Sequence, residues 1–197
     1  AERMIREMGN GTNPSNNTKA KGSQLSQLNT PQTQINAVRK KYEGTSQWMK
    51  APNGQPTKLN EMQWLQVRTP NFKAWFGDWE NDAKNASKVV DANGEPMVVY
   101  HGTRTKEKFT EFYTFTAGIF GAGAYFTVRK HEAGGYAKGG EIYEAFINVK
   151  NPLSLSDKAF MQNYFRPATQ DEAISLGYDA VITTTGAEHK IDYVIAF

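Results

Sequence analysis

Hydrophobic positions are sparse at the start of the chain and become dense toward its end. The early stretch GNGTNPSNNTKAKGSQ has almost nothing to bury, so residues 1–34 are expected to be disordered or loosely attached. Residues 32–43 then place Ile35, Val38 and Tyr42 on one face of a short predicted helix. The pattern therefore indicates a polar arm that contains one short helix over residues 32–43.

An aromatic-rich segment follows the arm. Asn60 is a suitable cap for a helix that runs through Leu65, and Thr69-Pro70 indicates the end of this helix and the start of a second one. The second predicted helix carries aromatic residues at the i, i+3, i+4, i+7 spacing: Phe72, Trp75, Phe76 and Trp79. Such a stripe predicts core packing against the following domain rather than a platform for stacked bases.

Strands dominate the rest of the chain. Two valine-rich runs around Asn93-Gly94 predict a hairpin, and the second run ends at His101. Residues 141–149 alternate with period two, and further strands are expected in GAYFTV, YDAVITT and IDYVIAF. Strands and helices do not alternate regularly, which disfavours a doubly wound sheet. We therefore predict an α+β domain with a small, twisted, antiparallel sheet.

The pattern divides the chain into three parts. We predict a polar, basic, largely flexible arm over residues 1–59, a helical lead-in over residues 60–87 and a catalytic domain over residues 88–197. Residues 1–60 carry a net charge of +6 and the remainder −3, which together make the total of +3. A basic arm is compatible with nucleic-acid binding, but its scattered charges and few aromatics favour a solvated arm. Because the chain begins with Ala1, we expect a processed or excised piece of a longer protein.

Several common kinds of site are disfavoured. The chain has no cysteine, and its three histidines lack partners at metal-ligand spacing, so we predict no metal site. No run of eighteen apolar residues occurs, so we expect no membrane partner. The cluster GIFGAG has the wrong glycine order for a dinucleotide fingerprint and precedes a strand. Neither a phosphate-binding P-loop nor a G-x-S-x-G nucleophile motif is present.

Four fragments remain, and their order is informative: VVYHGTR, FGAGAYFT, YAK and IDYVIAF. In this order they resemble the His-Tyr-Glu branch of the ADP-ribosyltransferases, which contains diphtheria-toxin-like enzymes and poly(ADP-ribose) polymerases. The polymerases have a His-Gly-Ser, a Gly-x-Gly-x-Tyr-Phe strand, a second Tyr eleven residues later, and a late Glu-Tyr-x-Val. The corresponding residues here are His101-Gly102-Thr103, Tyr125, Tyr136 eleven residues on, and Asp192-Tyr193. Residues 60–197 also resemble transferase domains of phage and mobile-element polyvalent proteins.

The resemblance implies a small split antiparallel β-sandwich with inserted helices, and NAD+ as substrate in a cleft between two sheets. His101 would hydrogen-bond the ribose hydroxyls. The backbone of Gly102 would hold the nicotinamide carboxamide, with assistance from Thr103. Tyr125 and Tyr136 would sandwich the nicotinamide ring. Asp192 would stand at the position of the catalytic glutamate, so the implied catalytic residues are Asp192, His101 and Tyr125.

The chemistry of NAD+ cleavage suits these residue types. Nicotinamide is cationic while bound to ribose, and aromatic faces attract a cation. A carboxylate stabilises the positive charge that develops on the ribose as the bond breaks. Aspartate is one methylene shorter than glutamate, however, so Glu188 in the turn TGAEHK is retained as the alternative acid.

The resemblance leaves the acceptor open, as protein or nucleic acid. Arginine is the less natural target because no Glu-x-Glu precedes the last strand. An NAD+ glycohydrolase and a non-catalytic binding module on the same fold are alternatives. We expect a monomeric, toxin-like or phage-effector protein, acting in the cytoplasm of the producing cell or of a target cell.

Overall fold

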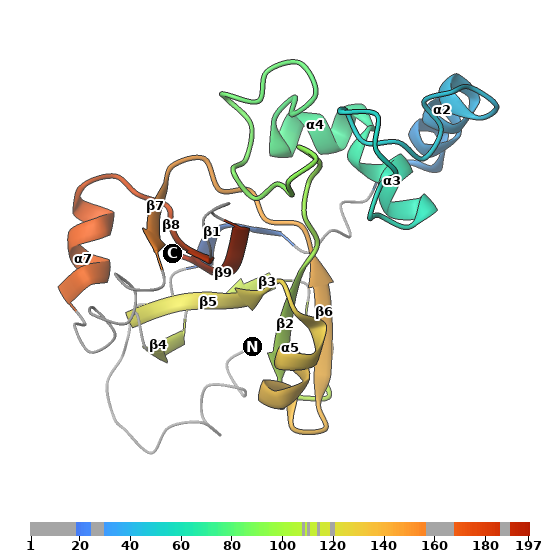
Figure 1. Cartoon of the computed structure of the whole chain (residues 1–197). Helices are drawn as coiled ribbons and strands as arrows, with labels where there is room; N and C mark the ends of the chain where they lie inside the picture. The colour runs from blue at the N-terminus through green and yellow to red at the C-terminus, as the bar shows by residue number, and fades with distance from the viewer. Residues whose placement is uncertain are drawn as a thin grey trace.

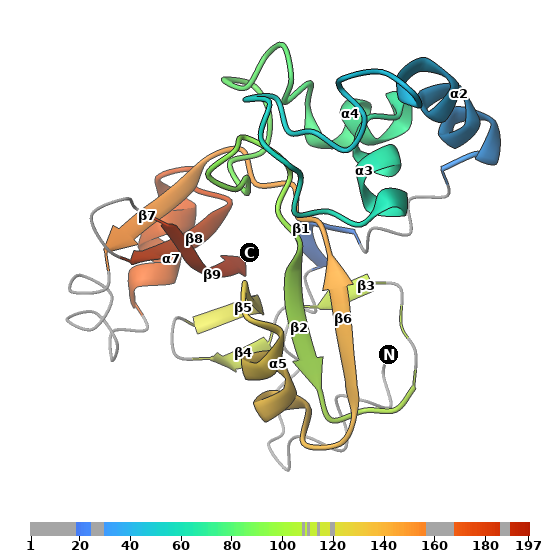
Figure 2. The same cartoon turned by 45° about the vertical axis from the view of Figure 1, so that its right-hand side comes forward.

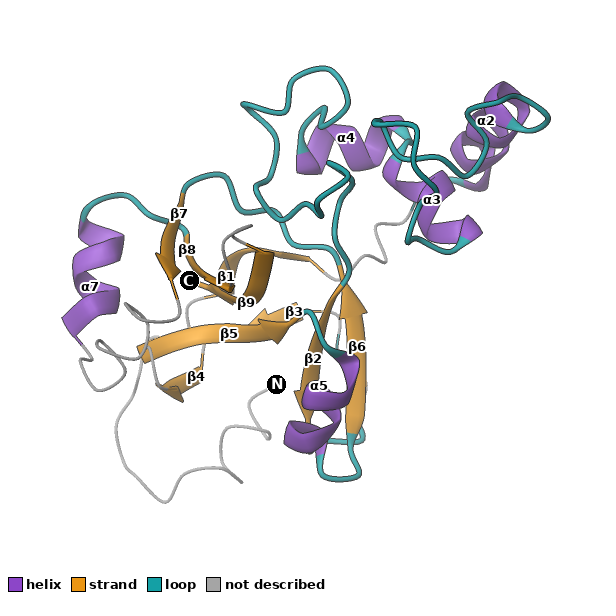
Figure 3. Cartoon of the chain, viewed as in Figure 1, coloured by secondary structure: helices purple, strands orange, loops and turns teal. Residues whose placement is uncertain are grey.

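The computed structural model describes residues 19–24, 30–107, 109, 111–113, 115–118, 121–156, 168–185 and 190–197. A helical unit precedes a domain built on one mixed sheet (Figures 1 and 3). The helical unit lies to one side of the sheet and connects to it through the chain that leads into the second strand. This arrangement confirms the α+β class.

Three helices form the helical unit: α2 (Gln32–Tyr42), α3 (Glu61–Val67) and α4 (Pro70–Phe76). The predicted cap of α3 is confirmed, because the Asn60 side chain accepts from Gln63 N and the Gln63 side chain accepts from Asn60 N. Thr69 caps α4 in the same way by accepting from Phe72 N.

The aromatic stripe does lie in the core, but its helix is shorter than predicted. Phe72, Phe76 and Trp79 are buried, whereas α4 already ends at Phe76. Gly77 follows at φ 100°, a backbone region that favours glycine, and a Cβ there would lie 2.5 Å from Ala86 Cα. The chain returns close to Gly77 at Ala86, nine residues later, and the spacing of the aromatic residues does not reveal that the helix ends there.

Residues that we placed in the arm pack with the lead-in. Ile35, Val38 and Leu59 are buried in the same cluster as Trp64 and Phe72. Part of the segment 30–59 is therefore built into the helical core. The predicted helix at 32–43 corresponds to α2.

The sheet has the strand order β6 (Glu141–Ala145), β2 (Val99–Thr103), β5 (Gly121–Thr127), β9 (Lys190–Ala196), β8 (Ala180–Thr185) and β7 (Pro152–Ser156). β4 (Phe115–Gly118) also pairs with β5. β1 (Lys19–Gln24) and β3 (Glu111–Tyr113) form a separate antiparallel pair. β7 and β8 run parallel, so the sheet is mixed rather than wholly antiparallel as predicted.

The sheet changes direction between β2 and β5. Tyr100 is the β2 residue in register with β5, opposite Thr127, whereas β2 and β6 pair from Val99 to Thr103. β2 and β6 consequently run across the direction of β5 (Figures 1 and 2). His101 and the residues after it therefore lie where the two parts of the sheet diverge.

Helix α5 (Lys130–Ala137) packs on β2, and α7 (Ala168–Ser175) precedes β8. Ala133 and Ala137 face the sheet, and a Cβ on Gly102 would lie 1.9 Å from the Ala133 carbonyl oxygen. Only glycine at position 102 allows α5 to come this close to the strand.

We expect Gly102→Ala to lower the free energy of unfolding by about 1–3 kcal/mol, the usual cost of overpacking. Gly135→Ala is the matched control, because a Cβ on this α5 glycine meets nothing within 4 Å. That control should instead stabilise the helix by up to about 1 kcal/mol. Chemical denaturation of both variants measures the difference, and equal stability would contradict the close packing of α5 on Gly102.

Candidate active site

Three neighbouring strands carry most of the candidate residues. β2 holds His101, Gly102 and Thr103, the adjoining β5 holds Tyr125, and β9 on the far side of β5 holds Asp192. Tyr136 lies on α5, which covers β2 (Figure 1). The fold therefore collects segments that are up to 91 residues apart in sequence around the centre of one sheet.

His101 is joined to the Tyr125 backbone rather than to its ring. Its Nδ1 lies 2.8 Å from the Tyr125 carbonyl oxygen, which only accepts, so Nδ1 carries the proton. Burial lowers the pKa of His101, although the Tyr125 carbonyl partly opposes this shift. His101 is accordingly neutral near pH 7, and its Nε2 is the acceptor of the imidazole.

The rings of His101 and Tyr125 lie on opposite faces of the sheet. His101 contacts Phe112 and Phe126, with ring centres 5.0 and 5.5 Å away. Tyr125 packs instead with the cluster that contains Ile195. Alternation along β5 places Tyr125 and Phe126 on different faces.

Tyr136 is not a core residue. Its side chain is 63% exposed on α5, whereas Ala133 and Ala137 of the same helix are buried against the sheet. An exposed ring on the helix that covers β2 is available to a ligand. Thr103, in contrast, is buried at the end of β2.

Asp192 occupies a β-bulge. Thr183 pairs with Tyr193, but the next residue, Thr184, pairs with Ile191, so β9 has one extra residue at Asp192. A bulge changes the direction of a side chain and is common beside active sites. The Asp192 side chain is nearly buried, and its Oδ1 forms an ion pair with Nη1 of Arg129.

Arg129 is in turn held by Glu132. The Arg129 Nε lies 2.5 Å from Glu132 Oε1, and Glu132 Oε2 accepts from Thr127 Oγ1 at 2.9 Å and from Tyr193 OH at 2.8 Å. Burial alone would raise the pKa of Glu132, but hydrogen bonds from Arg129, Tyr193 and Thr127 lower it. Glu132 is therefore a firmly ionised carboxylate that is joined to Asp192 through Arg129.

Sequence reasoning missed Arg129 and Glu132. The sequence does contain a sign of this pair: Arg129 and Glu132 stand three residues apart at the start of the helix that follows the Tyr125 strand, a spacing that allows an ion pair. The alternative acid, Glu188, lies outside the described residues. Among the described residues, no group of three His, Asp or Glu side chains is arranged to hold a metal ion. No helix in the described part of the chain has the length and apolar character to cross a bilayer.

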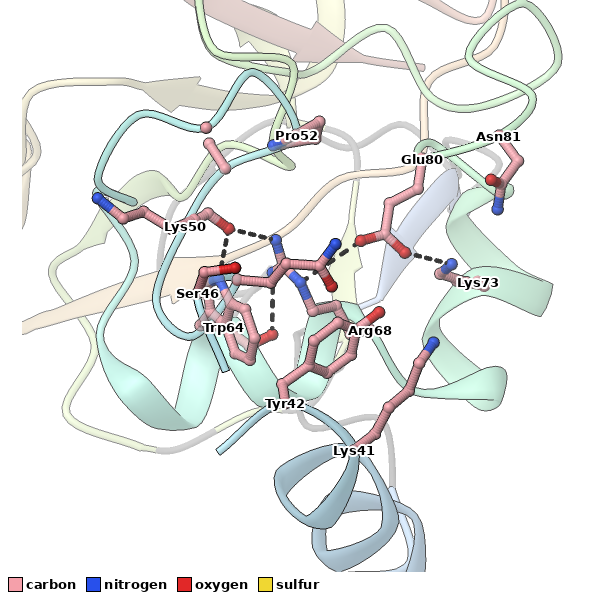
Figure 4. Close-up of a pocket in the computed structure, with 13 residues that line it drawn as sticks. Lys41, Tyr42, Ser46, Lys50, Pro52, Trp64, Arg68, Lys73, Glu80 and Asn81 are labelled. Atoms are coloured by element: carbon pink, nitrogen blue, oxygen red, sulfur yellow. Dashed lines mark hydrogen bonds and ion pairs between the residues drawn. The ribbon is translucent and has the colours of Figure 1, made fainter. Parts of the chain in front are cut away.

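A pocket of about 530 Å³ lies in the helical unit, lined by residues such as Lys41, Tyr42 and Glu80 (Figure 4). None of the candidate residues lines it. Its wall contains Arg68, which donates to the Lys50 carbonyl at 2.9 Å and to Glu95 at 2.8 Å. These contacts of Arg68 link the wall of the pocket to Lys50 and Glu95.

Comparison with known proteins identifies the family of the C-terminal part of the chain. The family model described as "ADP-ribosyltransferase in polyvalent proteins" matches residues 91–197, from the turn before β2 to the end of β9. No curated protein and no solved structure matches the chain. The matched region contains every candidate residue, whereas the helical unit precedes it. The chain therefore belongs to the ADP-ribosyltransferases of polyvalent proteins.

Proposed function

We propose that the chain transfers ADP-ribose from NAD+ to a macromolecular acceptor, in the manner of the His-Tyr-Glu branch and its split β-sandwich. One observation carries this proposal. Within the region that matches the transferase family, the strands on either side of β5 carry a neutral histidine, His101 on β2, and an acid in a β-bulge, Asp192 on β9.

The roles follow from the chemistry of each group. The resemblance assigns a ribose hydroxyl to Nε2 of neutral His101, but this ring lies on the sheet face opposite that of Tyr125, so the contact would have to be made where β2 diverges from β5. The main chain at Gly102 would hold the carboxamide there. Tyr125 and Tyr136 would flank the nicotinamide ring, and Thr103 would support β2 at the site. Asp192 would stabilise the oxocarbenium-like ribose.

The proposed transfer breaks one bond of NAD+ and forms one bond to the acceptor. The electron pair of the C1′–nitrogen bond leaves with nicotinamide and neutralises its ring. A nucleophilic oxygen or nitrogen of the acceptor then bonds to C1′ and releases its proton. Positioning and electrostatic stabilisation account for this kind of catalysis.

Incubating the protein with labelled NAD+ and cell lysate tests the proposal. We expect nicotinamide release together with ADP-ribose on protein or nucleic acid, identified by mass spectrometry. Release without an adduct would favour the glycohydrolase, and NAD+ binding without release would favour a binding module.

We expect Tyr136→Ala to weaken NAD+ binding by about 1–3 kcal/mol, the usual value of one aromatic stacking contact. Because Tyr136 is exposed, the change should leave stability nearly intact. Tyr136→Phe is the control, since it keeps the ring and should keep the affinity. Titration calorimetry with NAD+ measures both, and wild-type affinity in Tyr136→Ala would remove this residue from the site.

A further inference from the structure

The proposed catalytic acid is paired with a cation. Asp192 Oδ1 has essentially no exposed surface and accepts no hydrogen bond of regular geometry, and it is held by its ion pair with Arg129. The side chain as a whole remains 11% exposed, so its accessible surface is not at Oδ1. One carboxylate oxygen is thus held by the protein while another part of the side chain stays accessible.

Arg129 is itself fixed in place. Its guanidinium uses Nε for Glu132 and Nη1 for Asp192, so one planar group joins two carboxylates. Glu132 is anchored independently by Thr127 of β5 and Tyr193 of β9. This chain of contacts links the start of α5 to β5 and β9, two of the three strands that carry the candidate residues.

The charges of Arg129 and Glu132 leave Asp192 able to stabilise a positive charge on the ribose. An arginine alone beside Asp192 would cancel much of its field, because opposite charges in contact neutralise each other. Glu132 offsets Arg129, so the three groups together keep one negative charge. The arrangement holds a carboxylate without removing the charge that an oxocarbenium-like ribose needs.

We propose that Arg129 is a positioning residue for Asp192: it holds Oδ1 so that Oδ2 faces the ribose of NAD+. The inference rests on the function proposed above. The short reach of aspartate makes such a hold valuable, since a displacement of about 1 Å at a reacting centre costs roughly 10²-fold in rate. The bulge sets the direction of Asp192, and the Arg129 ion pair sets its final position.

Steady-state kinetics of nicotinamide release test the proposal. Arg129→Met should lower kcat by roughly 10²-fold, the cost of a misplaced reacting group, with KM for NAD+ nearly unchanged. Arg129→Lys should recover part of the loss, because an ammonium can pair with Oδ1 but lacks the planar fork. Lys130→Met is the control: it removes the next cation, which pairs with Glu144, and should leave kcat unaltered. Glu132→Gln loosens Arg129 without removing it and should lower kcat less.

The decisive measurement is a double-mutant cycle. In the Asp192→Asn background, Arg129→Met should cost no more than about threefold further, because residues that act as a unit are not additive. Fully additive losses, or a raised KM in both backgrounds, would mean that Arg129 contacts NAD+ itself and would overturn the proposal. A rise in kcat in Arg129→Met would also overturn it, because Arg129 would then mask Asp192. A folded wild-type protein that releases no nicotinamide would contradict the proposed function instead, and thermal melting of each variant separates these outcomes from unfolding.

Discussion

Asp192→Asn is expected to lower nicotinamide release by about 10²-fold or more, with the affinity for NAD+ nearly unchanged. The substitution keeps the shape of the side chain but removes the charge that opposes the developing oxocarbenium ion. Asp192 lies in the bulge of β9, next to Tyr193 and one guanidinium away from Glu132. Single-turnover release of nicotinamide, measured beside an NAD+ titration, separates the loss in rate from any loss in binding.

Three further variants make the result specific. Asp171→Asn removes an exposed carboxylate on α7 and should leave the rate unchanged. Asp192→Glu restores the residue typical of the family that the chain resembles and should retain activity. Glu188→Gln tests the alternative acid. A wild-type rate in Asp192→Asn would refute its assignment, and inactivity of Glu188→Gln alone would place the acid in the turn.

Arg68→Met is expected to lower the free energy of unfolding by about 3–5 kcal/mol, the usual cost of breaking a buried ion pair. The Arg68 side chain is 3% exposed and that of its partner Glu95 is 1% exposed. Arg68 also donates to the carbonyls of Lys50 and Trp64 (Figure 4). Its Cζ atom lies 3.9 Å from the centre of the Trp64 ring. Without Arg68, the buried Glu95 carboxylate keeps the hydrogen bond from the Thr57 hydroxyl as its one side-chain partner in the described part of the chain.

The effect should extend beyond the helical unit, because Arg68 follows α3 and Glu95 lies in the turn before β2. Urea denaturation measures the loss. The matched control is Arg39→Met, which removes a partly exposed arginine paired with Glu61 and should change the midpoint little. The double variant Arg68→Met with Glu95→Gln should regain part of the stability, since no unpaired charge stays buried. A wild-type midpoint in Arg68→Met would contradict this account.

Local signals in the sequence determined a substantial part of the fold. The Asn60 cap, the end of α3 and the burial of the aromatic stripe follow from residues within one or two helical turns of each other. The turn at Asn93-Gly94 is present, with Gly94 at φ 80° and Gly94 N bonded to the Asp91 carbonyl. Such features depend on periodicity and short-range hydrogen bonds, which a single sequence displays.

The sequence also indicated the chemistry of the site, through its motifs. The order of His101, Tyr125, Tyr136 and Asp192 indicated a transferase family, and the match over residues 91–197 confirms a domain of that kind. The specific roles of these residues stay predictions. Their spacing says that they belong to one motif, but it does not say which face of a strand each ring occupies.

Only the tertiary structure decided the remaining features. The parallel pairing of β7 with β8 and the contact between Gly102 and α5 each depend on segments distant in sequence. The pairing of Arg129 with both Glu132 and Asp192 also depends on how β9 lies beside β5, because Asp192 is 63 residues away from Arg129 along the chain. Long-range contacts of this kind arise from chain topology and close packing, and no local pattern of hydrophobic and polar residues encodes them.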